Sequence, residues 1–125
     1  MDYSKPTAQM LGRYQPWHDG HTALFKSAHH MLGQVCIMVR TSEPNKNNPY
    51  PYTTVHDRIC NVLTTLGYDK DDYNVIAVPN ITDISYGRDV GYTFTEHDLG
   101  DEIHAISATN IRAKHAQIFG TDFLV

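Results

Sequence analysis

This chain is built around the segment Gly12-Arg13-Tyr14-Gln15-Pro16-Trp17-His18-Asp19-Gly20-His21. An apolar run from Ala8 to Leu11 precedes it, and an amphipathic run from Thr22 to Leu32 follows it. A short apolar run predicts a buried strand, and apolar residues at spacings of three and four predict a helix. The segment is therefore predicted to join a first strand to a first helix, which is where α/β proteins bind phosphate groups.

Two histidines, His18 and His21, lie at the predicted start of this helix, with Gly20 between them. Backbone N–H groups point outward at a helix start, and the helix dipole favours negative charge there. Imidazole N–H groups would add side-chain hydrogen bonds to a polyphosphate, and Gly20 would let a nucleotide lie close to the backbone. The turn is therefore a candidate phosphate-binding site.

Length and composition restrict the class of protein. The chain has 125 residues, 41% of them hydrophobic and 19% charged, so we expect residues 1–125 to form one domain. A net charge of −4 argues against general nucleic-acid binding, which depends on Lys and Arg. We see no signal peptide and no apolar stretch of about 18 residues, and two isolated cysteines suit a reducing compartment. We expect a cytoplasmic protein with no nucleic-acid or membrane partner.

The order of apolar runs predicts the fold. A strand over 7–11, a helix over 22–32 that Gly33 ends, and a strand over 34–39 make a βαβ unit. The continuous apolar character of the second strand is typical of a parallel sheet covered on both faces. We therefore expect an α/β protein, a Rossmann-like three-layer sandwich with a mainly parallel sheet. The core face of the first helix is predicted to hold Leu24, Ala28, Met31 and Leu32.

A long polar loop over 40–52 comes next, and a buried third strand is predicted over 74–78. Between them, Thr53 or Thr54 is predicted to cap a second helix, which Gly67 ends. Its apolar stripe is predicted to hold Val55, Ile59, Val62, Leu63 and Leu66. Beyond Pro79 the pattern is weaker: it predicts an extended segment over 81–84, turns at Gly87 and Gly91, strands over 92–95 and 103–106, and a last helix that begins at Ser107 or Thr109 and passes Ile118.

Two motifs resemble a known superfamily. The segment 12–21 resembles the GRFQPxHxGH signature of the HxGH nucleotidyltransferases, which include cytidylyltransferases and archaeal-type nicotinamide mononucleotide adenylyltransferases. Ile106-Ser107-Ala108-Thr109-Asn110-Ile111-Arg112 resembles their second signature, ISxTxIR. A weaker third match, Asn48-Pro49-Tyr50 to Asp57-Arg58, is similar to the NPFTxxER segment of the archaeal-type enzymes, with two residues inserted.

This resemblance implies transfer of a nucleoside monophosphate from ATP or CTP to a small phosphorylated acceptor, with release of pyrophosphate. It implies that His18 and His21 stabilise the transition state. It also implies a magnesium ion that bridges the phosphates, and the sequence indicates no protein ligand for this ion. Arg13, Ser107, Thr109 and Arg112 would hold the pyrophosphate. Tyr86, Gly87 and Arg88 match no defined motif, but their position in the chain suggests contact with the base or ribose. The full set of expected nucleotide-binding residues is Gly12, Arg13, Tyr14, Gln15, Gly20, Lys26, Tyr86, Gly87, Arg88, Ser107, Thr109 and Arg112.

Several alternatives stay open at this stage. The Arg-Tyr-Gln-Pro lead-in favours ATP over CTP, and the short region between Pro79 and Ser107 leaves the acceptor undefined. A homodimer or larger homo-oligomer would complete such a shortened acceptor side. The rival hypothesis is a non-catalytic nucleotide-binding module that acts as a sensor or assembly partner. A zinc site on the two histidines is disfavoured because no third ligand stands at a suitable spacing. Arg40 and Arg58 are interpreted as solvated or structural residues.

Overall fold

The structure is a computed structural model that describes residues 1–88 and 91–100. Its elements follow the order β1 (Ala8–Gly12), α1 (Asp19–Leu32), β2 (Val35–Arg40), α2 (Tyr52–Thr65) and β3 (Tyr73–Val78). Every element predicted before Pro79 is therefore present, with small shifts in its bounds. The strand predicted over 103–106 and the last predicted helix lie outside the described residues.

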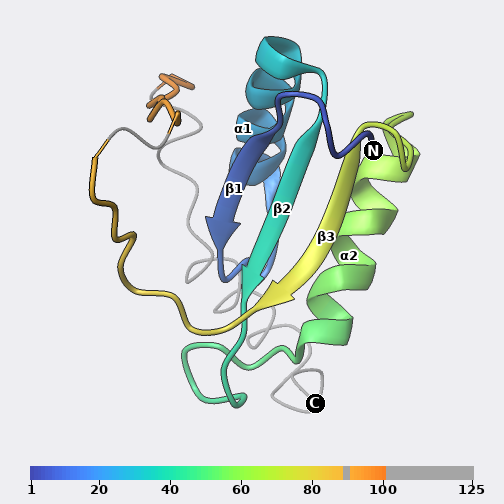
Figure 1. Ribbon diagram of the computed structural model, residues 1–125. Helices are drawn as coiled ribbons and strands as arrows, with labels where there is room; N and C mark the ends of the chain where they lie inside the picture. The colour runs from blue at the N-terminus through green and yellow to red at the C-terminus, as the bar shows by residue number, and fades with distance from the viewer. Residues whose placement is uncertain (89–90, 101–125) are drawn as a thin grey trace.

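The strands form one parallel sheet in the order β1-β2-β3 (Figure 1). Ala8 of β1 lies opposite Val35 of β2, and at the other end of this pair Gly12 lies opposite Val39. The last residue of β2, Arg40, lies opposite Val78 of β3. The three strands therefore end side by side, at what we call the carboxyl edge, and the segment 12–21 begins there.

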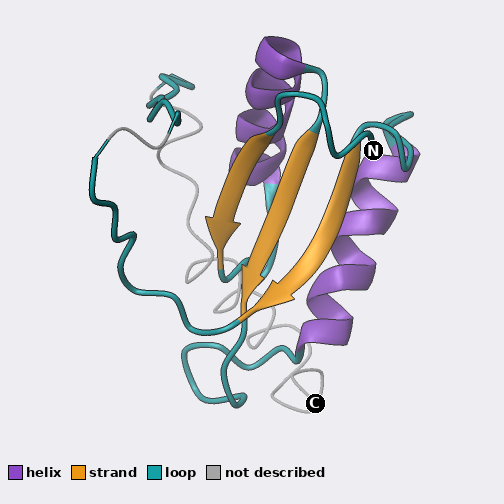
Figure 2. Ribbon diagram, viewed as in Figure 1, coloured by secondary structure: helices purple, strands orange, loops and turns teal. Residues whose placement is uncertain are grey.

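Both helices pack on the same face of this sheet (Figure 2). Val35, Ile37 and Val39 alternate along β2, so they share one face, and each is at most 1% exposed. They belong to the same core cluster as Phe25 of α1 and Ile59 of α2. The predicted α/β class with a parallel sheet is confirmed, and the described residues hold one layer of helices.

The opposite face of the sheet is less buried. Cys36 and Met38 of β2 are half-buried, and Ile76 of β3 is 37% exposed. Within the described residues, β2 is thus fully buried on one face only, and in β3 only Tyr73 is buried. Cys36 and Cys60 are free thiols, as the sequence predicted. No helix among residues 1–88 and 91–100 has the length and apolar character needed to cross a membrane.

The core face of α1 differs from the prediction. Phe25 and Ala28 are buried, whereas Met31 and Leu32, both predicted to face the core, are 45% and 40% exposed. The sheet lies under the Phe25 side of the helix. Leu24, Met31 and Leu32 instead line a groove beside β1, together with residues 91–97. Apolar spacing therefore predicted the helix, the burial of Ala28 and the packing of Leu24 against the core, but it missed Phe25 and wrongly placed Met31 and Leu32 in the core.

The ends of α2 also correct the prediction. The N-cap residue is Pro51, not Thr53 or Thr54, and no side chain caps this helix. A proline suits this position because its fixed φ, here −68°, prepares the chain for the first turn. At the other end Leu66, predicted to lie in the core, is the C-cap residue and is 47% exposed.

No strand is present after β3 in the described ranges 79–88 and 91–100. The strand predicted over 92–95 is therefore wrong, and the segment 81–84, predicted as extended, carries no strand assignment. Tyr92 and Phe94 are 69% and 71% exposed. Strand structure requires a neighbour that pairs with its backbone groups, and no described strand pairs with residues 92–95.

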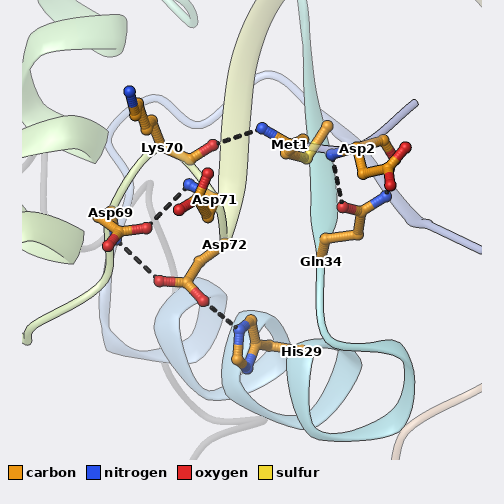
Figure 3. Close-up of polar contacts among 8 residues, drawn as sticks. All are labelled: Met1, Asp2, His29, Gln34, Asp69, Lys70, Asp71 and Asp72. Atoms are coloured by element: carbon orange, nitrogen blue, oxygen red, sulfur yellow. Dashed lines mark hydrogen bonds and ion pairs between the residues drawn. The ribbon is translucent and has the colours of Figure 1, made fainter. Parts of the chain in front are cut away.

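Polar contacts fasten the opposite, amino edge of the sheet (Figure 3). The Gln34 side chain accepts a hydrogen bond from the backbone N–H of Asp2 and donates one to its carbonyl oxygen, at 3.2 and 2.7 Å. His29 Nε2 of α1 lies 2.8 Å from Asp72 Oδ1, just before β3. These bonds join the N-terminal segment, α1 and the start of β3 far from the carboxyl edge.

We predict that Gly33→Ala lowers the free energy of unfolding by about 1 kcal/mol. Gly33 ends α1 with a φ of 85°, and a Cβ added there would meet no atom within 4 Å, so the cost is backbone strain alone. Urea denaturation measures the change. Gly87→Ala is the matched control, because that glycine also has open space around it but no left-handed φ. Equal losses in the two variants would contradict this account.

Candidate active site

The turn after β1 begins with a close contact between Gly12 and Tyr14. Tyr14 has a left-handed backbone with a φ of 52°, which folds its ring back over the end of β1. A Cβ on Gly12 would lie 2.9 Å from two atoms of this ring. Any side chain at position 12 would therefore displace Tyr14. Gly12 is needed for the shape of the turn, and this is the role that the structure supports for it.

Gln15 links the turn to the loop before α2. Its side-chain amide donates to the carbonyl oxygen of Tyr50 at 2.9 Å and accepts from the N–H of Tyr50 at 2.8 Å. Both residues are buried, and the peptide bond between Gln15 and Pro16 is cis. A buried amide that satisfies both backbone groups of one residue fixes the spacing between two loops. Gln15 therefore holds the turn in place.

Trp17 is the buried anchor of the turn, with 1% of its surface exposed. Its indole Nε1 donates to the Thr22 hydroxyl at 2.8 Å, and its carbonyl oxygen accepts from Arg58 Nε of α2, also at 2.8 Å. The ring lies 5.3 Å from the imidazole of His21. Residues from both helices thus fix the chain immediately before His18.

The two histidines cap the start of α1. His18 is the N-cap residue, and its Nδ1 accepts a hydrogen bond from the N–H of Gly20 at 3.0 Å. The N–H of His18 donates in return to Nδ1 of His21, also at 3.0 Å. This is a reciprocal capping box, a role usually filled by Ser or Thr with Glu or Gln. It explains why α1 begins before the predicted Thr22.

This capping fixes which ring nitrogen carries the proton. A ring nitrogen that accepts from a backbone N–H is unprotonated, so each neutral imidazole holds its proton on Nε2. The two rings are stacked, with centroids 3.8 Å apart, and this leaves both Nε2–H groups on the far side from the helix backbone. The site therefore presents two neutral donors beside the positive end of the α1 dipole.

The surroundings keep both rings neutral. Burial lowers the pKa of His21 to about 3, with a further contribution from the neighbouring His18 ring. Burial also lowers the pKa of His18, and the Asp19 carboxylate opposes this shift. Donor hydrogen bonding to phosphate at pH 7 therefore needs no protonated histidine.

Positive charge at the site comes from three arginines. Arg13 Nη2 donates to Asn80 Oδ1 at 2.7 Å, Arg40 Nη1 donates to the carbonyl oxygen of Ile81 at 2.9 Å, and Arg58 contacts Trp17 as described above. In the described part of the chain, no carboxylate lies within ion-pair distance of any of these arginines. A protein of net charge −4 therefore keeps unneutralised cations around this turn.

The other predicted residues that the structure describes, Lys26, Tyr86, Gly87 and Arg88, have no hydrogen bond to this cluster among the described residues. Lys26 is exposed and lines a groove between α1 and α2, on a different side of α1 from His21. Tyr86, Gly87 and Arg88 lie on the exposed segment after β3, and no contact among the described residues joins them to the turn. Ser107, Thr109 and Arg112 lie outside the described residues.

Sequence analysis did not predict the residues that hold the side chains of the turn in place by hydrogen bonds. Asn80, Tyr50 and Thr22 hold Arg13, Gln15 and Trp17, respectively. No sequence pattern indicates these hydrogen bonds, and those of Asn80 and Tyr50 join separate stretches of chain. Arg58 lies in the weak NPFTxxER match, and its interpretation from the sequence is a solvated or structural residue. The structure confirms the structural interpretation.

The described residues contain no group of three His, Cys, Asp or Glu side chains that would hold a metal ion. Asp19 is the carboxylate next to the histidine pair in sequence, at the first turn of α1. The donor set around the turn consists of imidazoles and guanidinium groups, which suit anions. A divalent ion at this turn would therefore be held through the phosphate groups of a ligand.

Comparison with known proteins agrees with this geometry. A family model described as cytidylyltransferase-like matches residues 10–82. Two crystal structures of a bifunctional NMN adenylyltransferase/ADP ribose pyrophosphatase from Francisella tularensis, one complexed with AMP and a Mn ion, are similar at 25% identity over 60% of this chain, with TM-scores of 0.56. This chain spans 23% and 22% of those two chains. A comparison with curated proteins found no match.

We predict that stability falls as the pH drops from about 6.5 towards about 3, in part because of His21. The pKa of His21 is lower in the folded chain than the ordinary 6.5, so between these two pH values the unfolded state binds more protons than the folded state. Lowering the pH therefore favours the unfolded state and decreases the free energy of unfolding. His21→Gln keeps the capping acceptor but removes the titration. Urea denaturation across this pH range should give the variant a shallower slope. An NMR titration of His21 with a pKa near 6.5 would contradict the assignment.

Proposed function

Because this chain belongs to the cytidylyltransferase-like family, we propose that it transfers a nucleoside monophosphate from ATP or CTP to a small phosphorylated acceptor. An acceptor oxygen forms a bond to the α-phosphorus while the bond from that phosphorus to the bridging oxygen breaks. Pyrophosphate leaves with the electron pair. No covalent intermediate with the protein is needed, and none of the described residues forms a nucleophile–base pair at the turn.

The observation that carries this proposal is the capped histidine pair. Both imidazoles are neutral, both carry their proton on Nε2, and both stand at the N-terminus of α1 next to the carboxyl edge of a parallel sheet. Ligands of open α/β sheets bind outside this edge. A triphosphate there would receive hydrogen bonds from His18 and His21 and feel the positive end of the helix dipole.

The chemistry needs positioning and charge neutralisation rather than a strong base. As the bridging bond breaks, negative charge builds up on the phosphate oxygens, and donors already held in place stabilise it without reorganising. Gln15, Trp17 and Arg58 supply this rigidity from outside the phosphate site. Arg13, at the start of the turn, is placed to exchange Asn80 Oδ1 for a phosphate oxygen of the departing pyrophosphate.

The finer assignments belong to the same proposal. The Arg-Tyr-Gln-Pro lead-in and the likeness to an NMN adenylyltransferase support ATP as the donor, with CTP as the alternative. A magnesium ion held by phosphate oxygens and water would neutralise charge on the triphosphate. Ser107, Thr109 and Arg112 would complete the pyrophosphate contacts. We also propose that the protein works in the cytoplasm as a homodimer or larger homo-oligomer, so that a second subunit adds to the acceptor side.

We predict that His18→Asn stays folded but releases pyrophosphate about 10²–10³-fold more slowly. Asparagine is a good N-cap residue, so α1 keeps its start while the ring donor is lost. Pyrophosphate release from ATP or CTP across a panel of phosphorylated acceptors, together with the melting temperature, measures both effects. His30→Asn, on the exposed face of α1, is the matched control and should leave the rate unchanged.

Two other outcomes of this assay carry separate meanings. If the wild-type chain binds ATP or CTP but releases no pyrophosphate with any acceptor, the hypothesis of a non-catalytic nucleotide-binding module is supported and the enzyme hypothesis is refuted. Equal rates for wild type and His18→Asn would remove the histidine pair from the mechanism, whatever the substrate.

A further inference from the structure

Of the three arginines around the turn, Arg40 is the one that the proposed mechanism does not use. It is the last residue of β2, and β2 lies between β1 and β3. It therefore stands at the middle of the carboxyl edge, between the ends of the two neighbouring strands. Its partner in the register is Val78, and the residue before it, Val39, lies opposite Gly12, where the histidine-bearing turn begins.

The Arg40 side chain leaves β2 on the face away from the helices. Val35, Ile37 and Val39 face the helices and are buried, so Cys36, Met38 and Arg40 share the other face. The Arg40 charge nonetheless acts on the Tyr14 hydroxyl, where it opposes the rise in pKa that burial causes. Tyr14 in turn packs edge-on against His21, with ring centroids 4.8 Å apart. Tyr14 therefore lies between Arg40, whose charge acts on its hydroxyl, and the His21 ring, which it contacts.

The contacts of Arg40 are too few for a purely structural arginine. Its Nη1 donates to the carbonyl oxygen of Ile81, and its Nε is buried without a hydrogen-bond partner among the described residues. No described carboxylate lies within ion-pair distance. A partly buried guanidinium with one neutral acceptor is costly in a ligand-free protein. A negatively charged hydrogen-bond acceptor would satisfy this guanidinium and neutralise its charge.

We propose that Arg40 binds a substrate phosphate group at the carboxyl end of β2, exchanging the Ile81 carbonyl for phosphate oxygens. A guanidinium suits this role because its paired N–H groups match two oxygens of one phosphate. The identity of the phosphate rests on the proposed function, in which both the donor triphosphate and the acceptor carry one. This proposal departs from the sequence interpretation of Arg40 as a solvated or structural residue.

The test compares Arg40→Met with Arg40→Lys and with Lys46→Met, an exposed residue in the loop after β2. Calorimetry on the full chain measures binding of ATP, and of inorganic phosphate with and without saturating ATP. Arg40→Met should weaken binding of one of these anions about 10- to 100-fold, as expected for loss of a charge-assisted hydrogen bond. Arg40→Lys should be intermediate, and Lys46→Met should stay within about twofold of wild type.

The melting temperature of the ligand-free variants separates ligand binding from a structural role. If the role of Arg40 is to bind an anion, Arg40→Met removes a charge without an ion-pair partner, and the melting temperature of the ligand-free variant equals or exceeds that of the wild type. Weaker ATP binding would identify a donor phosphate, and weaker binding of inorganic phosphate beside ATP would identify the acceptor phosphate. Wild-type affinities for both anions, or a lower melting temperature with unchanged affinities, would overturn the proposal.

Failure of this inference is distinguishable from failure of the proposed function. If the wild type turns over substrate and Arg40→Met binds both anions normally, the proposed enzymatic function stands and the role of Arg40 in it is refuted. If anion binding depends on Arg40 but no acceptor is turned over, the Arg40 site stands and the enzymatic function is refuted.

Discussion

The whole site depends on two hydrogen bonds from backbone N–H groups to imidazole nitrogens. The N–H of Gly20 and the N–H of His18 lack helical partners at the start of α1, and Nδ1 of His18 and Nδ1 of His21 accept from them. The same bonds that begin the helix orient both rings and fix their tautomer. Helix capping and the orientation of the two imidazoles therefore come from the same pair of hydrogen bonds.

The rest of the turn is built to keep this constraint in place. Gln15 binds the backbone of Tyr50, Trp17 is held from α1 and α2, and Tyr14 covers Gly12. These contacts come from stretches of chain that the sheet brings together at its carboxyl edge. The turn therefore enters a ligand complex already shaped, and binding energy is not consumed in ordering it.

Much of this arrangement could be predicted from the sequence because it is local. The βαβ unit follows from apolar periodicity, and Gly33 marks the end of α1 through its left-handed φ. The position of the turn between β1 and α1 follows from the same pattern, and its role as a candidate phosphate site follows from its residues. The core face of α1 was wrong because Leu24 and Phe25 are both apolar neighbours, and only the sheet decides which of them is buried. The strand predicted over 92–95 failed for the same kind of reason, since strand structure depends on a partner.

The polar partnerships could not be predicted for a different reason. Arg13 with Asn80, and Gln15 with Tyr50, join residues far apart in the chain through single hydrogen bonds or one amide. Such pairs leave no periodicity and no composition signal. Arg40 shows the consequence most clearly: an arginine that ends an apolar strand is indistinguishable from a solvated one until its neighbours at the carboxyl edge are known.

The burial of Trp17 gives this protein a natural optical reporter. The chain contains a single tryptophan, and its indole lies against both the Tyr14 and His21 rings at the base of the turn. All tryptophan fluorescence therefore originates beside the histidine pair. A spectral change on adding a ligand would come from this turn alone, so its occupancy could be followed in real time without labelling the protein.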